Sequence, residues 1–308
     1  MSTASGAASP AESLPGGHVA LATPRRALVT GAAGMLGSDV VTALAQAGFQ
    51  VIPRARQDLD VTDSAAVGRA FREAGPDVVV NCAAFTKVDD CETDPRAHAD
   101  NAAAVEILAE ECLARSIQLV HVSTDFVFDG AKRSPYTEQD ETGPLSAYGR
   151  TKRAGEEAAL RVPEALVVRS SWLFGRSGWN FVEAILRQVE SGRSPLSVVQ
   201  DQRGRPTGTP DLAEAIVALI LSRGSGVYHF ANRGEASWLE FAEAIVSLAG
   251  RGEVPVMPID SATLARPAVR PAYSVLDTGR YEAKTGKPIR PWRDALAEYL
   301  AARARPEA

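Results

Sequence analysis

The sequence predicts an α/β protein built on a doubly wound parallel sheet. Three observations lead to this fold class. Short apolar runs, such as residues 26–29 and 78–80, alternate with longer amphipathic segments, as expected when helices cover both faces of a parallel sheet. Spaced glycines join the first apolar run to the first amphipathic segment. Polar side chains follow later strands directly, at the sheet edge where such folds bind ligands.

Length and composition narrow the class of protein. The 308 residues are enough for one large domain or two unequal ones. A net charge of −5 argues against a nucleic-acid-binding protein, and no apolar run reaches the ~18 residues of a membrane span. The sequence begins without the basic and apolar regions of a signal peptide. Cys82, Cys91 and Cys112 have neither metal-site spacing nor an even number for disulfides, so we expect a reducing, cytoplasmic location.

Residues 1–24 are rich in Ala, Ser, Gly and Pro, and we expect them to be disordered. The first element after this tail is a strand over residues 26–29. Gly31, Gly34 and Gly37 follow it and lead into a helix over residues 35–47. A strand, a glycine turn and a helix together indicate dinucleotide binding, because the helix N-terminus offers free N–H groups to a pyrophosphate. The expected cofactor contacts in this turn are Gly31, Ala33, Gly34, Met35, Leu36 and Gly37.

A second strand over residues 50–53 ends where such folds hold the adenine ribose. An acidic residue there would favour NAD, but Arg54 and Arg56 follow instead. Because arginine pairs with a ribose 2′-phosphate, the sequence favours NADPH, with NADH possible and a solvated basic loop as the alternative. Asp60 and Val61 are placed near the adenine.

Two further strands carry small or polar residues at their ends. A helix over 64–74 precedes the strand 77–82, which leads into Ala83, Ala84, Phe85 and Thr86. The acidic loop after it is expected to be a solvated surface. A long helix over 97–115 contains Asn101, which we expect to be a buried hydrogen-bonding residue. The strand 117–123 ends at Thr124 and Asp125.

Tyr148 and Lys152 stand four residues apart at the start of a helix that runs through residue 160, so they share one helical face. A phenol exchanges protons poorly at neutral pH, and an ammonium beside it would lower its pKa. The pair then suits proton exchange with a carbonyl or hydroxyl group.

The remaining chain alternates between strands and helices. Strands are expected over 165–170, 196–199, 226–230 and 254–258, and helices over 178–190, 210–221, 238–249 and 291–302. We therefore expect a dinucleotide-binding domain over residues 25–171. Residues 172–308 form mainly a smaller substrate domain, with residues 207–232 returning to the main sheet.

Several motifs in combination resemble one family. They are Gly31-x-x-Gly34-x-x-Gly37, Asn81-Cys82-Ala83-Ala84, residues 84–89, residues 122–130, Tyr148-x-x-x-Lys152, Arg169-Ser170-Ser171-Trp172, residues 201–207 and Arg270-Pro271-x-x-Ser274-x-Leu276. From about residue 26 to 302 the chain resembles the dTDP-4-dehydrorhamnose reductases, which are extended short-chain dehydrogenases/reductases with a Rossmann-like fold.

The resemblance implies that NADPH reduces the C4 ketone of dTDP-4-dehydro-L-rhamnose, giving dTDP-L-rhamnose for cell-surface polysaccharide. It implies that Tyr148 donates the proton, Lys152 holds the nicotinamide ribose and lowers the pKa of Tyr148, and Thr124 positions the reacting oxygen. The implied substrate contacts are Val88, Thr124, Asp125, Tyr148, Trp172 and Arg270.

Three other functions remain open from the sequence. One is another sugar-nucleotide ketoreductase or epimerase. The others are a non-catalytic regulatory subunit of the methionine adenosyltransferase β type and a dinucleotide-sensing regulator. Some members of the family bind Mg²⁺ at a dimer contact, and Asp39 lies where one of the acidic residues would be; metal dependence and a homodimer are both left open.

Overall fold

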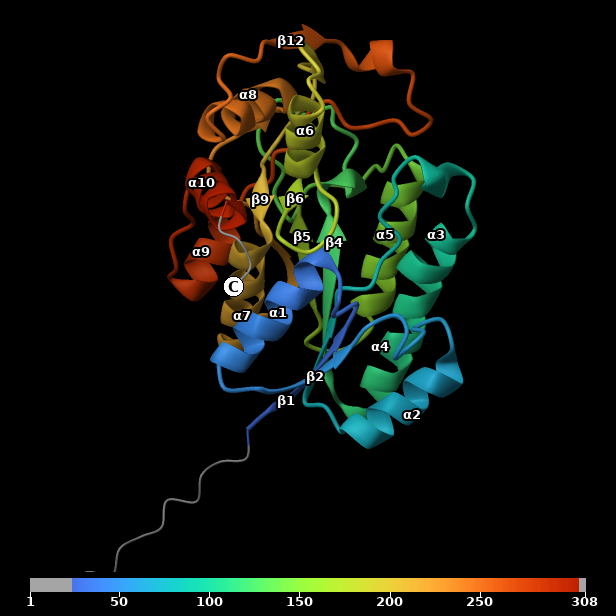
Figure 1. Ribbon diagram of the computed structural model, residues 1–308. Coiled ribbons are helices and arrows are strands. Elements are labelled where there is room, and N and C mark those ends of the chain that lie inside the picture. The colour runs from blue at the N-terminus through green and yellow to red at the C-terminus, as the bar shows by residue number, and fades with distance from the viewer. Residues whose placement is uncertain (1–23, 305–308) are drawn as a thin grey trace, which may run out of the picture.

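A computed structural model describes residues 24–304, and its largest layer is a six-stranded parallel sheet (Figure 1). The strand order is β10-β5-β4-β3-β1-β2. The strands are β1 (Arg26–Thr30), β2 (Gln50–Arg54), β3 (Val78–Asn81), β4 (Gln118–Thr124), β5 (Leu166–Ser170) and β10 (Gly226–His229). The tail expected over residues 1–24 lies, apart from Pro24, outside the described residues.

Helices cover both faces of this sheet because successive strand side chains point to opposite sides. Val29 and Val80 pack on one side with α1 (Met35–Gln46), α7 (Thr209–Leu221) and α9 (Gly279–Thr285). Leu28 and Val79 pack on the other with α2 (Ser64–Ala74), α4 (Ala104–Arg115) and α5 (Ala147–Ala159). The predicted doubly wound α/β fold is therefore confirmed.

The chain changes direction across the sheet at β1, which lies between β2 and β3. Thr30 at the end of β1 is in register with Asn81 at the end of β3. In open parallel sheets this reversal leaves a crevice at the carboxyl ends of the two strands, where ligands bind. The glycine turn and the small residues after Asn81 are both located there.

A second group of elements lies beyond the carboxyl ends of the strands (Figure 1). Its helices are α6 (Phe181–Glu190), α8 (Trp238–Leu248) and α10 (Trp292–Arg303), which pack around the buried Phe241. Three short strand pairs complete it: β6 (Leu173–Phe174) with β9 (Thr207–Gly208), β7 (Leu196–Val199) with β12 (Val256–Ile259), and β8 (Arg203–Gly204) with β11 (Ala236–Ser237).

The helix expected over residues 97–115 is interrupted. It consists of α3 (Arg96–His98), a π-helical turn (Ala99–Ala103) and α4. Asn101 lies in the π turn, where its side chain accepts a hydrogen bond from the N–H of Phe85 at 2.8 Å and donates to the carbonyl of Phe85 at 3.0 Å. Its expected role as a buried hydrogen-bonding residue is confirmed, and π turns of this kind occur often at functional sites.

Other differences from the sequence expectation are small. The helix expected from residue 178 begins at Phe181, because the Asn180 side chain accepts a hydrogen bond from the N–H of Glu183 and caps it. The short helix α9 was not predicted.

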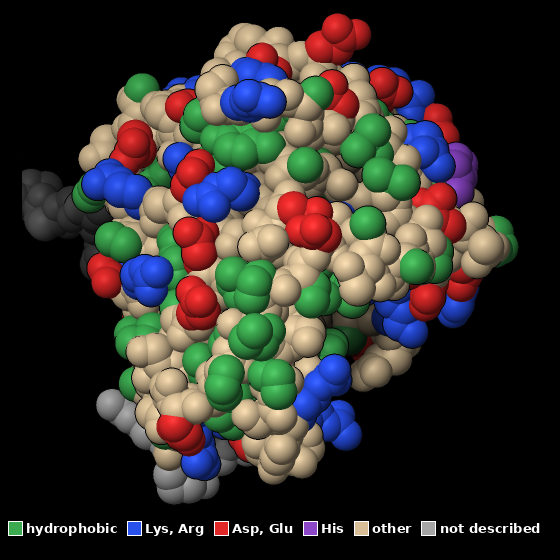
Figure 2. Space-filling view, turned by 90° about the horizontal axis from the view of Figure 1, so that it is seen from above, with side chains coloured by type: hydrophobic (Ala, Val, Ile, Leu, Met, Phe, Trp, Pro, Cys, Tyr) green, Lys and Arg blue, Asp and Glu red, His purple; other side chains and the backbone are tan. Residues whose placement is uncertain are grey.

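In the described part of the chain, no helix is both long and apolar enough to cross a bilayer. The face seen from above carries interspersed acidic and basic side chains (Figure 2).

Candidate active site

The glycine turn brings β1, α1 and β3 unusually close together. Gly31 has a φ of +65°, and a Cβ there would lie 2.7 Å from the backbone nitrogen of Ala83. A Cβ on Gly37 would overlap the carbonyl oxygen of Gly31. Only glycine fits either position. Because no side chain projects there, the backbone N–H groups at the start of α1 are open to an anionic ligand.

A cavity of about 240 Å³ lies directly on this turn. Seven of the residues predicted to contact the cofactor line it: Gly31, Ala33, Gly34, Asp60, Val61, Ala83 and Ala84. Met35, Leu36 and Gly37 form the adjoining first turn of α1. Arg56, Leu59, Cys82 and Asp100 complete the wall, and Arg56 pairs with Asp100 at 3.3 Å.

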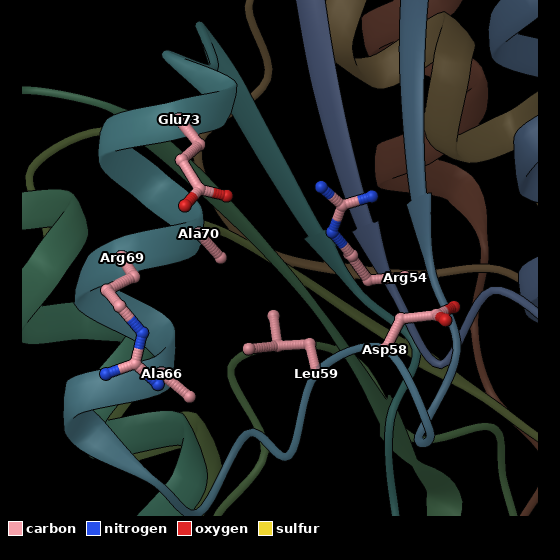
Figure 3. A pocket seen from close by; sticks show the side chains of 7 residues that line it. All are labelled: Arg54, Asp58, Leu59, Ala66, Arg69, Ala70 and Glu73. Atoms are coloured by element: carbon pink, nitrogen blue, oxygen red, sulfur yellow. The ribbon is translucent and has the colours of Figure 1, made fainter.

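A second pocket of about 380 Å³ shares Leu59 with this cavity. Arg54 at the end of β2 and Asp58 in the loop after it border this pocket on one side, and Arg69 and Glu73 border it from α2 (Figure 3). Arg54 therefore faces a pocket next to the cavity that holds the predicted adenine contacts. Two guanidinium groups, of Arg54 and Arg69, and two carboxylates, of Asp58 and Glu73, thus line this pocket.

Tyr148 is presented by the first turn of α5. The hydroxyl of Ser146 caps the helix by accepting a hydrogen bond from the N–H of Gly149 at 3.2 Å. The Tyr148 ring meets Phe126 edge-on, with 5.5 Å between ring centres, and its hydroxyl lies near enough to that of Thr124 for Thr124 to influence its pKa. The catalytic side chains predicted from α5 and from the end of β4 are thus brought together.

The pKa of Tyr148 differs from the sequence expectation. Burial raises it above its ordinary value, and the interaction with Thr124 only partly opposes that change. The expected lowering by Lys152 is not found: Nζ of Lys152 donates to the carbonyl of Val122 at 2.7 Å and lies 3.3 Å from Nε2 of His121. Burial also lowers the pKa of Lys152, to about 8.

Asp125 holds the side chain of Thr124 through a hydrogen bond. Its carboxylate accepts hydrogen bonds from Oγ1 of Thr124 at 3.1 Å and from Oγ of Ser274 at 2.5 Å. Burial raises the pKa of Asp125 to about 6, and the hydrogen bonds from Ser274 and Thr124 oppose this. Asp125 therefore ties the end of β4 to the segment that follows Arg270.

The other predicted ligand contacts are spread over two loops and a strand end. Phe85 is buried against Tyr148, Thr86 is exposed and Val88 is partly buried. Trp172 has a φ of +49° and stacks on Trp238, with 3.6 Å between ring centres.

Arg270 is held by Asp89, the residue after Val88. Nη1 and Nη2 of Arg270 each lie 3.0 Å from a carboxylate oxygen of Asp89. Burial raises the pKa of Asp89, but hydrogen bonds from Arg270, the N–H of Ala268 and Arg266 hold it below its usual value. The acidic loop expected to be merely solvated thus binds the 266–270 segment through this residue.

Several neighbours of the site were missed from the sequence. Arg69 could have been found, since Ala66, Arg69, Ala70 and Glu73 share one face of a helix. His121, Asp89 and Trp238 gave no such signal, because their partners are far away in the chain.

A metal site is not apparent in the described residues: among residues 24–304 no three His, Cys, Asp or Glu side chains are grouped as ligands. Asp39 accepts a hydrogen bond from Thr209 at 2.6 Å, and burial raises its pKa.

The chain is similar to proteins of one chemical type. It is 46% identical over 277 residues to a probable dTDP-4,6-dihydroxy-2-methyloxan-3-one 4-ketoreductase of Streptomyces antibioticus, covering 89% of this chain and 94% of that protein. It is 45% identical over 281 residues to a dTDP-4-dehydrorhamnose reductase of Streptomyces griseus, covering 89% and 92%.

A solved structure agrees with these relatives. A dTDP-4-dehydrorhamnose reductase of Bacillus anthracis in complex with NADP superposes with a TM-score of 0.87 at 33% identity, covering 91% of this chain and 100% of that one. Residues 25–305 match the family described as the RmlD substrate binding domain. With the glycine turn, the tyrosine–lysine pair and this match over nearly its whole length, the chain belongs to the RmlD substrate binding domain family.

Proposed function

We propose that this chain reduces the C4 ketone of dTDP-4-dehydro-L-rhamnose to dTDP-L-rhamnose with NADPH, for cell-surface polysaccharide synthesis. The observation that carries the proposal is that Tyr148 lies against Thr124 while Lys152, one helical turn further along α5, lies beside Cys82 in the wall of the cofactor cavity, in a chain 45% identical to a reductase of that substrate. The free thiols of Cys82, Cys91 and Cys112 support a reducing, cytoplasmic location.

The residues present fit a nicotinamide dinucleotide. The cradle at Gly31 and Gly37 excludes side chains, and the adjoining cavity continues to Asp60 and Val61. We assign the pyrophosphate to the turn from Gly31 to Gly37, the adenine to Asp60 and Val61, and the nicotinamide ribose to Tyr148 and Lys152. A bound nicotinamide supplies the hydride.

The protein's own contribution is to place and deliver a proton. As hydride reaches C4, negative charge develops on the ketone oxygen, and the Tyr148 hydroxyl gives that oxygen its proton. Tyr148 is left as phenolate and takes a proton back from solvent. The raised pKa of Tyr148 keeps the phenol protonated until charge develops on the substrate. Thr124 has a single hydroxyl hydrogen, which it donates to Asp125, so it orients the ketone oxygen by turning that hydrogen from Asp125 to the substrate.

Cofactor preference gives a first prediction. Replacing Arg54 and Arg69 by serine should reduce the NADPH-over-NADH ratio of kcat/KM about 10- to 100-fold, because each guanidinium can give a charged hydrogen bond to the 2′-phosphate. Arg72→Ser is the matched control, since Arg72 is on α2 but does not line the pocket. A ratio unchanged in the double variant would mean that the two arginines only border the pocket.

Sugar-nucleotide binding gives a second prediction. Arg270→Gln should raise KM for the dTDP-sugar about 10- to 100-fold with kcat little changed, because a largely buried guanidinium suits a pyrophosphate. Arg266→Gln is the control: it also pairs with Asp89, but its side chain is 53% exposed, so we expect less than about a threefold change. Equal effects in both variants would remove the specific role of Arg270.

The decisive test is NADPH oxidation by the purified chain with dTDP-4-dehydro-L-rhamnose, with the product identified as dTDP-L-rhamnose. Turnover of another dTDP-4-keto-sugar instead would select a sister ketoreductase, a possibility favoured by the 46% identity to the S. antibioticus protein. Cofactor binding with no turnover of any 4-keto-sugar would contradict the enzymatic proposal.

A further inference from the structure

His121 is a buried titratable residue that the proposed reaction does not use. It lies in β4 and is completely inaccessible to solvent. Strand register places it beside Asn81 of β3, which is itself beside Thr30 of β1. The three side chains form a hydrogen-bonded row that ends at Nζ of Lys152 from α5.

The orientation of the Asn81 amide follows from its neighbours. Its Oδ1 accepts a hydrogen bond from the hydroxyl of Thr30 at 2.6 Å and from the backbone N–H of Ala83 at 3.1 Å. The hydroxyl of Thr30 could also accept, but the N–H of Ala83 can only donate, so turning the amide would place Nδ2 against a donor. The Nδ2 group therefore faces Nδ1 of His121 at 3.2 Å, and Nδ1 must accept.

The remaining ring nitrogen then carries the proton. Burial, more than any charge on Lys152, holds the pKa of His121 well below its usual value, so the imidazole is neutral and has one N–H. With Nδ1 accepting, that hydrogen is on Nε2, which lies 3.3 Å from Nζ of Lys152. An ammonium has no lone pair to accept it, whereas a neutral amine does.

We propose that His121 is a positioning residue that donates its Nε2–H to Nζ of Lys152 and thereby favours the neutral amine. Nζ uses one of its own hydrogens to donate to the carbonyl of Val122 at 2.7 Å. The consequence rests on the proposed function: where Lys152 is the neutral amine, which is the major form above about pH 8, it must take up a proton from solvent before it acts as a cation beside Tyr148 and the ribose.

Other groups around Lys152 keep its pKa close enough to neutral pH for this proton exchange to occur. Burial lowers its pKa to about 8, while Glu156 and Cys82 favour the charged form. Both Glu156 oxygens accept hydrogen bonds from Arg169 at 2.7 Å, which limits their effect on Lys152. Tyr148, one helical turn away, is neutral because burial raises its pKa. His121 is thus a direct hydrogen-bonding partner that acts against the ammonium.

The test is ¹⁵N NMR of the histidine rings in the full chain without added cofactor. His229 is an internal reference with the opposite tautomer, since its Nδ1–H donates to the carbonyl of Tyr136 at 3.1 Å. Burial lowers the pKa of His229 to about 3, so it too is neutral. We expect two non-titrating histidines, one protonated at Nε2 and one at Nδ1. Two rings protonated at Nδ1 would overturn the proposal.

A second arm measures the effect on Lys152. In His121→Gln the amide can turn its oxygen toward Nζ and accept from an ammonium. The alkaline limb of kcat/KM should therefore move up by about one pH unit, a tenfold change in the proton equilibrium. His98→Gln, at an exposed histidine, should leave the limb in place. An unmoved limb in His121→Gln would overturn the control of Lys152 by His121. Because the spectrum needs no substrate, it remains decisive even if the proposed substrate is wrong.

Discussion

Tyr148→Phe should fold normally and lose about 10³-fold in kcat with dTDP-4-dehydro-L-rhamnose. The phenol oxygen is the proton donor in the proposed reaction, and general acid catalysis contributes about 10²- to 10⁴-fold. Phenylalanine keeps the edge-on ring contact with Phe126, so packing should be preserved. Steady-state NADPH oxidation measures the loss, and cofactor titration should show NADPH affinity changed less than about tenfold.

The matched control for this variant is Tyr228→Phe. Tyr228 is a buried tyrosine of β10, outside the residues assigned to cofactor or substrate. Removing its hydroxyl should leave kcat within about twofold, since surface and packing changes away from the site act on stability rather than on proton transfer. If Tyr148→Phe kept turnover within tenfold of the native chain, Tyr148 would not be the proton donor.

Activity should also depend on pH through two groups with displaced pKa values. Asp125 has its pKa raised to about 6, so it is largely ionised above that pH and can accept the hydrogen bonds that hold Thr124 and Ser274. As pH falls through 6, protonation converts one acceptor oxygen into a donor and weakens this hold. Lys152 changes charge near pH 8. Between about pH 6 and pH 8, therefore, Asp125 is ionised and Lys152 is a cation, which are the charges proposed for the site.

The fold could be predicted from the sequence because most of its elements have a recognisable local sequence pattern. Buried parallel strands such as Val78–Asn81 are continuous apolar runs, and helices such as α7 have a clear apolar face. The break in the helix expected over 97–115 could not be predicted in the same way. It arises from the tertiary contact between Asn101 and the backbone of Phe85, and the residues around the break have ordinary helical propensities.

The candidate site was predictable where a motif requires a particular backbone, and not where it depends on distant pairs. The spacing of Gly31 and Gly37 reflects a close approach that only glycine permits. The pairing of Asp89 with Arg270 joins residues 181 positions apart, and the row from Thr30 to His121 crosses three strands. The same row explains the main chemical surprise, since Lys152 is directed to His121 and Val122 instead of lowering the pKa of Tyr148.

Among single added methyl groups in the proposed cofactor site, we expect the one in Gly37→Ala to cause the largest loss of stability and of NADPH binding. Its Cβ would overlap the carbonyl oxygen of Gly31, and backbone cannot move aside as a flexible side chain can. Either α1 shifts away from β1 or the glycine turn opens, and both changes displace the N–H groups assigned to the pyrophosphate. We expect a loss of about 3 kcal/mol in the free energy of unfolding, as for an overpacked core, and at least about tenfold weaker NADPH binding.

The measurement is a urea unfolding curve together with a fluorescence titration of NADPH, run beside Gly252→Ala. Gly252 has no atom within 4 Å of a Cβ built on it, so the same added methyl group should change neither quantity appreciably. If Gly37→Ala behaved like Gly252→Ala, α1 would not need to lie against the glycine turn, and the pyrophosphate would have to bind elsewhere. If Gly37→Ala lost stability but kept full NADPH affinity, Gly37 would serve helix packing alone, because the N–H groups of the turn would have kept their positions.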